Sequence, residues 1–574
     1  MRNSELAAPP QFLAKPGVME VLLCAITAFT YLGTLSFGFI YDDNVTIVRN
    51  AAIQSFRSVP QAFHSTAILH LYRPLTAFWM CANYALFGLK PAWWHLATLA
   101  LHVLITYLVF VVTYELVRDR STAFIAGLLF GVHPAHVENV AWVSAANDLL
   151  MSALLLGSFL AFLSYRKEER NGALGLSVAL FASALLTKET AVVFPVLILV
   201  FSWLFAAERS ETWRRAARSI QASAAFFGVL LVYLMARSFA MRNVVNGQAA
   251  VPSWKTMVLT WPSILWFDVC HLVLPIRLSE FYALRYVADP GLRTFVFPAA
   301  LLIAIGVGGV LWTRRLKYAA VAQFAGAWIL LALVPVLYLR GLTPDDFVHD
   351  RFLYLPSVGF VILIALAIRQ LPGSLTEPGK SVMQPAVFVL LALAGMVGTF
   401  SNQLPWASDV LLYENGLKFV PESSNLKDNL ANALAARGRS AEAIRLYQEV
   451  LERDPRFWRS NYNLGHEFLK AGKNQEAEEY LTRAVQIDGT DSDQYIFLAM
   501  AQWRQNKLAD ATQNGERAIA RSPQSSGFHY ILGMILDASG HRDRAISEFK
   551  QELANHPENT PARDQLGKLQ LSTN

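Results

Sequence analysis

Twelve apolar runs in the first 400 residues constrain the fold more than any other feature of this sequence. They lie near residues 17–37, 92–117, 121–133, 148–165, 172–187, 190–206, 219–239, 256–275, 295–312, 318–339, 353–369 and 383–400. A helix of about 20 apolar residues crosses the hydrocarbon core of a bilayer. Because 54% of the residues are hydrophobic and only 16% are charged, we predict an integral, all-α membrane protein rather than a soluble one.

Basic residues between these runs predict the topology. Short clusters such as Arg166-Lys167, Arg214-Arg215 and Arg314-Arg315 separate pairs of runs. Cytoplasmic loops carry an excess of Lys and Arg, and all the clusters face the cytoplasm only if one run between residues 239 and 294 does not cross. We assign that exception to 256–275, as a re-entrant or interfacial helix. The prediction is about eleven crossings, with the N-terminus inside, the C-terminus outside and the first run retained as an anchor.

Two carboxylates, Asp42 and Asp43, follow the first apolar run directly. On the predicted topology they lie just outside the membrane edge, where ionisable groups are costly unless they are used. A carboxylate in that position can act as a general base. We prefer Asp43 for this role because it lies one residue further from the membrane. The alternative is that the pair only ends a helix in water.

Three cations on the same predicted face are candidates for binding a phosphate: Lys188, Arg351 and Arg73. Lys188 precedes Glu189 and interrupts two apolar runs, whereas Arg351 lies at the outer end of a span. A guanidinium binds a phosphate in bidentate fashion, and a lysine supplies a fixed point charge. The alternatives are a short outer turn with a local ion pair for Lys188, and an interfacial arginine beside aromatic residues for Arg351.

His133, His136 and Glu138 place two imidazoles and a carboxylate within six residues. Their spacing is not that of a helical HExxH zinc site, and a proline breaks the first turn. We therefore expect these side chains, together with Asp148 and Glu189, to line a polar cavity rather than to bind zinc. Glu138 and Asp148 are candidates for a second acid. Whether a Mg²⁺ or Mn²⁺ ion takes part is left open, because carboxylate oxygens suit both ions.

After residue 405 the sequence becomes charged and rich in alanine, and a period of 34 residues begins. The repeated positions are Leu430, Leu464, Leu498 and Leu532; the small residues after them, Ala431, Gly465, Ala499 and Gly533; Ala443, Ala477, Ala511 and Ala545; and Pro455, Gly489, Pro523 and Pro557. This is the tetratricopeptide pattern, in which small residues let two helices of a hairpin approach. It predicts a membrane domain at 1–405 and a repeat domain at 406–574, with a half repeat followed by about four repeats.

Several motifs follow one another in a fixed order along the chain. They are Tyr41-Asp42-Asp43-Asn44, Arg73-Pro74-Leu75, His133-Pro-x-His136-x-Glu138-x-Val140-x-Trp142, Lys188-Glu189, Pro275-x-x-Leu278-Ser279 and Arg351-Phe-x-Tyr354-x-Pro356-Ser357, and the repeats come after them. In this order they resemble the transmembrane and tetratricopeptide-repeat O-mannosyltransferases and their bacterial relatives. That family is similar in architecture to the polytopic GT-C glycosyltransferases, which take a sugar from a polyprenyl-phosphate carrier on the non-cytoplasmic side.

The resemblance implies a site and an orientation. It puts Asp42 and Asp43 in the family's acidic site in the first outer loop, and it puts the repeat domain outside, in agreement with the topology predicted from the charges. Two departures from the family pattern leave the roles of Glu280 and Asn147 undecided. Relatives often have an Asp after Leu-Ser, where this chain has Glu280, and the usual Gly-Arg before the acid is replaced by Ala146-Asn147.

The expected function is the transfer of one hexose, mannose or a related sugar, from a polyprenyl-phosphate donor to Ser or Thr of an exported protein, with inversion. An aspartate would take the hydroxyl proton, and cations would stabilise the leaving phosphate. The repeats would bind the protein acceptor, the membrane would be a bacterial inner membrane, and no nucleic acid would take part. The alternatives are a non-catalytic scaffold for envelope or polysaccharide assembly, and a polyprenyl-linked glycan polymerase or ligase.

Overall fold

The computed structural model describes residues 17–66, 71–206, 212–242, 252–340, 347–372 and 382–571. Within these ranges every element is a helix, which confirms the predicted all-α class. The chain divides into two compact units, Met1–Val420 and Pro421–Asn574. We call them the membrane unit and the repeat unit.

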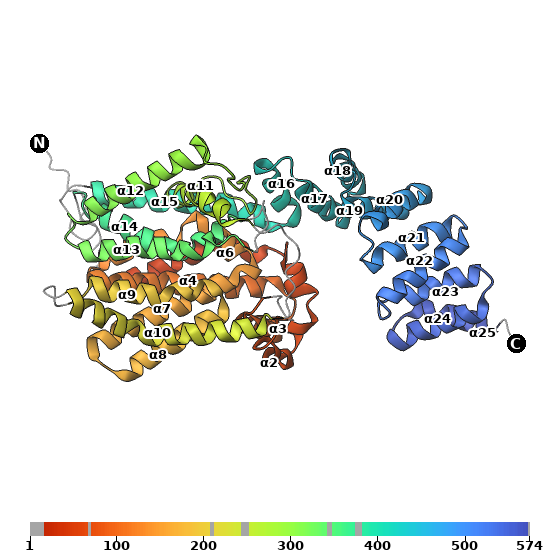
Figure 1. Ribbon diagram of the computed structural model, residues 1–574, viewed down its shortest axis with the longest axis horizontal. Coiled ribbons are helices and arrows are strands. Elements are labelled where there is room, and N and C mark those ends of the chain that lie inside the picture. Colours follow the sequence, from red (N-terminus) through yellow and green to blue (C-terminus); the bar gives the residue numbers. More distant parts are fainter. Residues whose placement is uncertain are drawn as a thin grey trace, which may run out of the picture. The chain divides into compact units, whose positions relative to one another are not determined.

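All twelve predicted apolar runs are helical (Figure 1). Among the described residues, eight segments are long and apolar enough to cross a membrane: Val18–Ser36 (containing α1, Val18–Tyr31), Pro91–Val117 (α4), Val143–Glu168 (containing α7, Ala146–Glu168), Thr212–Ala240 (α10), Trp254–Val273 (α11), Leu292–Thr313 (containing α12, Phe297–Thr313), Ala319–Leu337 (containing α13, Ala319–Leu333) and Met383–Ala407 (containing α15, Met383–Gln403). Shorter apolar helices of the same unit are Arg120–Gly131 (α5), Asn171–Thr187 (α8), Glu189–Leu204 (containing α9, Phe194–Leu204) and Pro356–Ile368 (α14). A polytopic membrane protein is confirmed, whereas the number of eleven crossings stays a prediction.

The segment between α1 and α4 contains helices that no apolar run predicted. α3 (Pro74–Phe87) begins directly after Arg73, with a proline at its first position, where the missing N–H is not needed. The one-turn helix α2 (Val59–Ala62) precedes it. A small core that contains Ile47, Ile53, Cys81 and Trp94 lies within this segment. The loop that carries the Asp pair is therefore a packed structure.

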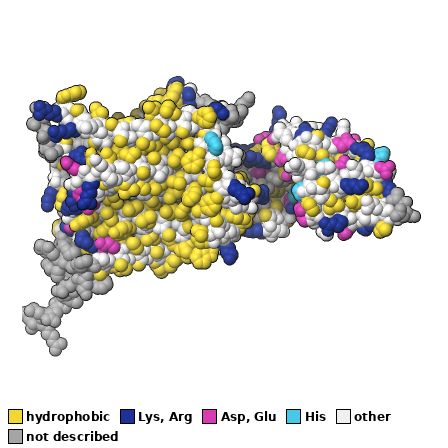
Figure 2. All heavy atoms as spheres, turned by 90° about the horizontal axis from the view of Figure 1, so that it is seen from below, with side chains coloured by type: hydrophobic (Ala, Val, Ile, Leu, Met, Phe, Trp, Pro, Cys, Tyr) yellow, Lys and Arg dark blue, Asp and Glu magenta, His cyan; other side chains and the backbone are white. Residues whose placement is uncertain are grey.

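The helix ends of the membrane unit fall into two groups. α4, α7, α12 and α14 end, and α5, α8, α10 and α13 begin, close in sequence to the basic residues Arg118, Arg120, Arg166, Lys167, Arg214, Arg215, Arg314, Arg315, Lys317 and Arg369. Figure 2 shows Lys and Arg side chains gathered at one end of this unit, beside a broad hydrophobic face. We call this the basic end, and the opposite end, where α1 and α13 end and α4 and α14 begin, the polar end. The grouping is the one that the positive-inside rule requires.

α11 (Trp254–Val273) is the helix predicted not to cross. Near its start, the Trp254 ring lies 6.4 Å from that of Tyr338, which follows α13. At its other end, Leu272 O lies 3.1 Å from His133 Nε2, which follows α5. Both ends of α11 therefore contact residues at the polar end of the unit. This supports the predicted interfacial or re-entrant placement, although the helix is long and apolar enough to cross.

The membrane unit is most closely packed around α5, in which every residue from Ser121 to Gly131 is buried. A Cβ atom at Gly131 would clash with Thr27 of α1 and would lie 2.9 Å from Thr106 Cγ2 of α4. The glycine therefore lets three helices meet just below the polar end. In contrast, α12 exposes most of its length, as expected for a helix in contact with lipid.

The repeat unit consists of helix hairpins. The pairs are α17 (Ser424–Ala436) with α18 (Ser440–Arg453), α19 (Trp458–Lys470) with α20 (Asn474–Ile487), α21 (Ser492–Arg504) with α22 (Leu508–Arg521), and α23 (Phe528–Ala538) with α24 (Arg542–Asn555), and α25 (Thr560–Leu571) follows. The periodic leucines and alanines are all buried. A Cβ atom at Gly465 would lie 2.7 Å from Leu481 Cγ, so the small residue lets α19 and α20 approach. The predicted tetratricopeptide hairpins are confirmed.

α16 (Asp409–Phe419) covers the half repeat that the sequence assigned to the repeat domain, and it packs in the membrane unit. Asp409 Oδ1 accepts a hydrogen bond from Tyr41 N at 2.7 Å, and Asn415 Nδ2 donates to Leu278 O at 3.1 Å. The division between the units accordingly falls after Val420, not after residue 405. The difference arises because α16 has partners in two loops of the membrane unit, which periodicity cannot reveal.

Candidate active site

The Tyr41-Asp42-Asp43 motif forms a strained turn at the polar end. Tyr41 has a φ of 53°, in the left-handed region that tyrosine rarely adopts. Its N–H donates to Asp409, and its ring centroid lies 5.5 Å from that of Trp142 and 5.9 Å from that of Phe281. These contacts hold the turn, which places the two aspartates in different surroundings.

Asp43 is fully buried. Its Oδ1 accepts hydrogen bonds from Ser144 N at 2.9 Å and from Ser144 Oγ at 2.5 Å, and its Oδ2 accepts one from Ile40 N at 3.3 Å. Burial raises the pKa of Asp43 to about 7, and the hydrogen bonds from Ser144 and Ile40 act in the opposite direction. Asp43 therefore connects the motif to the turn before α7. The easier approach expected for Asp43 from its place in the sequence is not found.

Asp42 is exposed. Desolvation raises the pKa of its carboxyl above the ordinary value, and the positive charge of Arg351 acts in the opposite direction. The Asp42 carboxylate is thus within electrostatic range of a guanidinium and can still be reached from solution. Of the predicted pair, Asp42 has the access that a general base needs.

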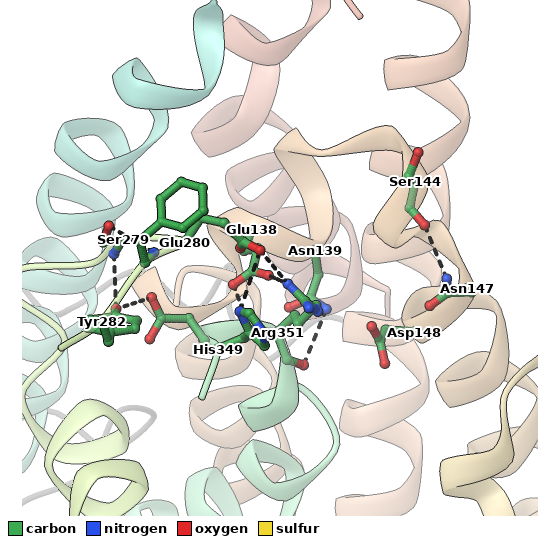
Figure 3. A network of polar contacts seen from close by, with 12 residues as sticks. Glu138, Asn139, Ser144, Asn147, Asp148, Ser279, Glu280, Tyr282, His349 and Arg351 are labelled. Carbon is green, nitrogen blue, oxygen red and sulfur yellow. Dashed lines mark hydrogen bonds and ion pairs between the residues drawn. The ribbon is translucent and has the colours of Figure 1, made fainter. Parts of the chain in front are cut away.

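Arg351 lies between two buried glutamates. Its Nη1 forms an ion pair with Glu138 Oε1 and lies 2.8 Å from Glu280 Oε1, while its backbone N–H donates to Glu138 Oε2 at 3.0 Å. The side chains of Glu138 and Glu280 are only 2% and 1% exposed. Figure 3 shows these three side chains converging from separate segments: α6 (Val137–Ala141), the loop at 279–282 and the turn before α14. The guanidinium is therefore fixed in place.

A second contact joins the same two segments. Tyr282 OH donates to Asp350 Oδ2 at 2.5 Å and accepts a hydrogen bond from Ser279 N at 2.9 Å. Burial raises the pKa of Asp350 well above its ordinary value, with the charge of Glu138 acting in the same direction. Glu280 and Tyr282 of the 279–282 loop thus bind Arg351 and Asp350, which are adjacent in the turn before α14. We call this group, Glu280, Tyr282, Asp350 and Arg351, the clasp.

A second group of charges surrounds Lys188, between α8 and α9. Lys188 Nζ donates to Asp148 Oδ1 at 2.6 Å, and both side chains are 7% exposed. Arg73 binds Glu189 through two hydrogen bonds, of 3.0 Å from Nε and 2.7 Å from Nη2. Burial lowers the pKa of Lys188, Asp148 raises it, and Arg73 and Arg351 lower it further. The three predicted cations therefore lie within electrostatic range of one another.

Each of the three predicted cations already has a carboxylate partner. Lys188 pairs with Asp148 across two helices, and not with Glu189 in a local turn as the alternative interpretation proposed. Arg73 pairs with Glu189, and Arg351 pairs with two glutamates. A donor phosphate would therefore have to compete with these carboxylates or use a positive charge from another residue.

The histidines predicted to line a cavity have structural partners. His133 Nε2 lies 3.1 Å from Leu272 O, and His136 Nε2 lies 2.8 Å from Ser357 Oγ. Burial lowers the pKa of His133 to about 4, with the hydrogen bond to Leu272 O acting in the opposite direction. The neutral rings therefore join α5 to α11 and to α14. Of the sequence cluster, only Glu138 reaches the clasp.

One set of described side chains has the spacing of metal ligands: Glu138, Glu280 and His349, whose ligand atoms lie within 4.8 Å of one another. The guanidinium of Arg351 contacts both carboxylates of this set. A dication would have to displace the guanidinium from both carboxylates, so these residues in this arrangement do not fit a divalent cation.

Sequence reasoning left Glu280 undecided and did not select Ser144, Asp409 or Arg237. Glu280 could have been selected as a site residue because it is a carboxylate next to an apolar segment. A charge in such a place is costly unless it has a partner. An arginine inside the apolar run of α10 gives the same signal for Arg237. Ser144 and Asp409 carry no such signal, since their partners are distant in the sequence.

Comparison with known proteins identifies relatives over most of the chain. It is 27% identical over 546 residues to the protein O-mannosyl-transferase Tmtc1 of Drosophila melanogaster, which covers 77% of this chain and 62% of the relative. It is 25% identical over 576 residues to TMTC3 of Mus musculus (90% and 61% covered) and 26% identical over 509 residues to TMTC1 of Homo sapiens (78% and 57% covered). The chain thus matches about three fifths of the length of these relatives.

The tetratricopeptide repeat family model matches residues 429–492 and 498–560, which cover the hairpins from α17 to α24. The predicted resemblance is confirmed by these matches together with the polytopic helical unit. Over most of its length the chain is therefore similar to proteins named protein O-mannosyl-transferases, and its C-terminal part matches the tetratricopeptide repeat model.

Proposed function

We propose that this protein transfers a hexose, mannose or a related sugar, from a polyprenyl phosphate to a Ser or Thr hydroxyl of an exported protein. The single observation that best supports the proposal is the exposed carboxylate of Asp42 within electrostatic range of the fixed guanidinium of Arg351. The relatives are named protein O-mannosyl-transferases. Transfer takes place at the polar end, which faces the non-cytoplasmic side of a bacterial inner membrane.

Asp42 is the general base in this proposal. The acceptor oxygen attacks the anomeric carbon and forms the new C–O bond, while the bond from that carbon to the phosphate oxygen breaks. The hydroxyl proton passes to Asp42, and the bonding electron pair leaves with the phosphate. One displacement inverts the anomeric centre. No general acid is required, because the phosphate is a good leaving group.

Lys188 and Arg73 would stabilise the departing phosphate, since both are held at the polar end and are within range of Arg351. Arg351 has a different role in this proposal, because Glu138 and Glu280 already bind its guanidinium. The clasp keeps its guanidinium near Asp42 and so favours the ionised form of the base. The phosphate contact predicted for Arg351 stays a prediction.

The proposal is tested with the purified full chain and polyprenyl phosphates that carry different labelled sugars, together with a mixture of exported proteins. Label should move from the lipid to Ser or Thr, and the anomeric configuration of the product should be the opposite of that of the donor. Transfer should persist in EDTA, because Arg351 occupies the place where a metal would bind the glutamates. If no sugar left any lipid, the protein would be a scaffold.

The repeat unit binds the protein acceptor in this proposal, as tetratricopeptide arrays bind peptides through stacked hairpins. A chain cut after Val420 should keep donor binding and lose transfer to proteins. The cut belongs there rather than after residue 406, because α16 holds Tyr41 through Asp409. Full transfer by the shortened chain would exclude the repeats from acceptor selection.

A further inference from the structure

Arg237 is a charge that the proposed mechanism does not use. It lies in the last turn of α10, within the apolar run that ends at residue 239. The neighbouring side chains Leu234, Met235 and Phe239 are exposed, as in a helix that faces lipid. An arginine in such a helix is costly and marks a functional site unless it only reaches for the interface.

The contacts of Arg237 place it with the phosphate cations. Its Nη1 lies 3.6 Å from Glu189 Oε2 and donates to Tyr233 OH at 3.3 Å. Glu189 Oε2 also accepts the shorter bond from Arg73 Nε, at 3.0 Å. Arg73 therefore satisfies Glu189 first, and Arg237 has the weaker pairing. Its side chain is also 25% exposed, which leaves it accessible to a ligand.

The balance of charge around Glu189 changes when Arg237 is included. Lys188 and Asp148 neutralise each other, as do Arg73 and Glu189. Arg237 adds a third cation beside the two carboxylates Asp148 and Glu189. A phosphate anion is attracted to such a surplus, and the guanidinium fork can bind two of its oxygens.

We propose that Arg237, with Arg73 and Lys188, forms the phosphate-binding site for the isoprenoid phosphate of the donor. This inference rests on the proposed function and names the residue that receives the phosphate. The phosphate lies at the polar end, next to Glu189 and Tyr233. The isoprenoid chain lies along the exposed apolar side chains of α10, Leu231, Leu234 and Met235.

The test measures the affinity of the purified full chain in detergent for farnesyl phosphate and for farnesol, which lacks the phosphate. Arg237→Met should weaken farnesyl phosphate binding about 10- to 100-fold, the cost of losing a charge-assisted hydrogen bond, and should leave farnesol binding unchanged. Arg242→Met is the matched control. Arg242 lies just beyond the same helix, with its guanidinium 4.1 Å from the Phe239 ring centroid, and among the described residues it forms no ion pair.

The outcomes separate this inference from the proposed function. If the wild-type chain binds both ligands equally, the polyprenyl-phosphate donor itself is wrong. If it prefers farnesyl phosphate and Arg237→Met keeps that preference, only the role of Arg237 is wrong. Equal losses for both ligands would make Arg237 a structural residue and would also overturn the inference. Should the Met variant fail to fold, Arg237→Gln, which removes the charge but keeps a polar side chain, is measured against the same expectations.

Discussion

The ion pairs at the polar end of the membrane unit differ from the surface ion pairs of the repeat unit. In the membrane unit, Lys188 and Asp148 are each 7% exposed, and Glu138 beside Arg351 is 2% exposed. In the repeat unit, the Arg483–Glu479 pair is 49% and 56% exposed, and the Arg544–Glu516 pair is 54% and 48% exposed. The same residue types therefore meet a poorly solvated interior at the polar end and water on the surface of the repeat unit.

The difference separates buried ion pairs, which are candidates for a functional role, from exposed ion pairs, which solvate a surface. An exposed ion pair contributes about 0–1 kcal/mol, because water screens it and ordering the side chains costs entropy. Removing one partner of a buried pair costs about 3–5 kcal/mol, because the other charge is left unsolvated. Because buried charges are costly, their concentration at the polar end of the membrane unit marks this end as the candidate active site.

The largest expected effect is on the rate. Asp42→Asn keeps the size of the side chain and removes the proton acceptor, so the transfer rate should fall about 10²–10⁴-fold with little change in donor affinity. Asp43→Asn is the comparison, and it should change the rate less than about tenfold, because Asp43 is buried behind Ser144. Single-turnover assays with a labelled donor measure both variants. Equal losses of transfer rate in the two variants would contradict the assignment of the general base to Asp42.

The next effect is on stability. Arg351→Met leaves Glu138 and Glu280 buried without their cation, so the membrane unit should lose about 3–5 kcal/mol. Arg483→Met, in the repeat unit, should lose less than about 1 kcal/mol, because its pair with Glu479 is exposed. Thermal unfolding of the full chain in detergent compares the two variants. A similar shift for both would contradict the distinction between the buried and the exposed pairs.

A packing change in the repeat unit should have a smaller effect. A Cβ atom at Gly465 would lie 2.7 Å from Leu481 Cγ and 3.1 Å from Leu481 N, so Gly465→Ala should destabilise the repeat unit by about 1–3 kcal/mol. Gly567→Ala, in α25, is the matched control, because its added Cβ has open space. It should stabilise the unit by about 0.5–1 kcal/mol, since alanine favours helix. Hydrogen exchange measures the repeat unit alone, and protection that is equal in the two variants would argue against the close approach.

The value of kcat/KM should fall gradually as the pH is lowered. The base must be ionised, so kcat/KM should be full above the pKa of Asp42 and should fall about tenfold per pH unit below it. Desolvation raises that pKa, so the fall should begin at a higher pH than for an ordinary aspartate. The profile is measured for the wild-type chain and for Asp43→Asn, which removes the other carboxyl with a raised pKa. If the acid limb disappeared in Asp43→Asn, it would belong to Asp43.

Local patterns in the sequence are enough to predict the helices and their classes. Apolar length predicted twelve helices in the membrane unit, and the 34-residue period predicted the hairpins, with Leu464 and Ala477 buried as the pattern requires. These features are local, because the spacing of apolar residues along a helix determines which of its faces is buried. The motif order also predicted the family resemblance, and loop charges grouped the helix ends into a basic end and a polar end.

The assembly of the candidate site depends on contacts that no local pattern predicts. Asp42 and Asp43 are neighbours in the sequence, but the left-handed turn at Tyr41 exposes the first and buries the second against Ser144. The guanidinium of Arg351 contacts Glu138 and Glu280, which lie 213 and 71 residues away in the sequence. Such pairings join residues far apart in the chain, and their energies depend on burial. Neither the partner of a charge nor its distance from water is set by the residues next to it in sequence.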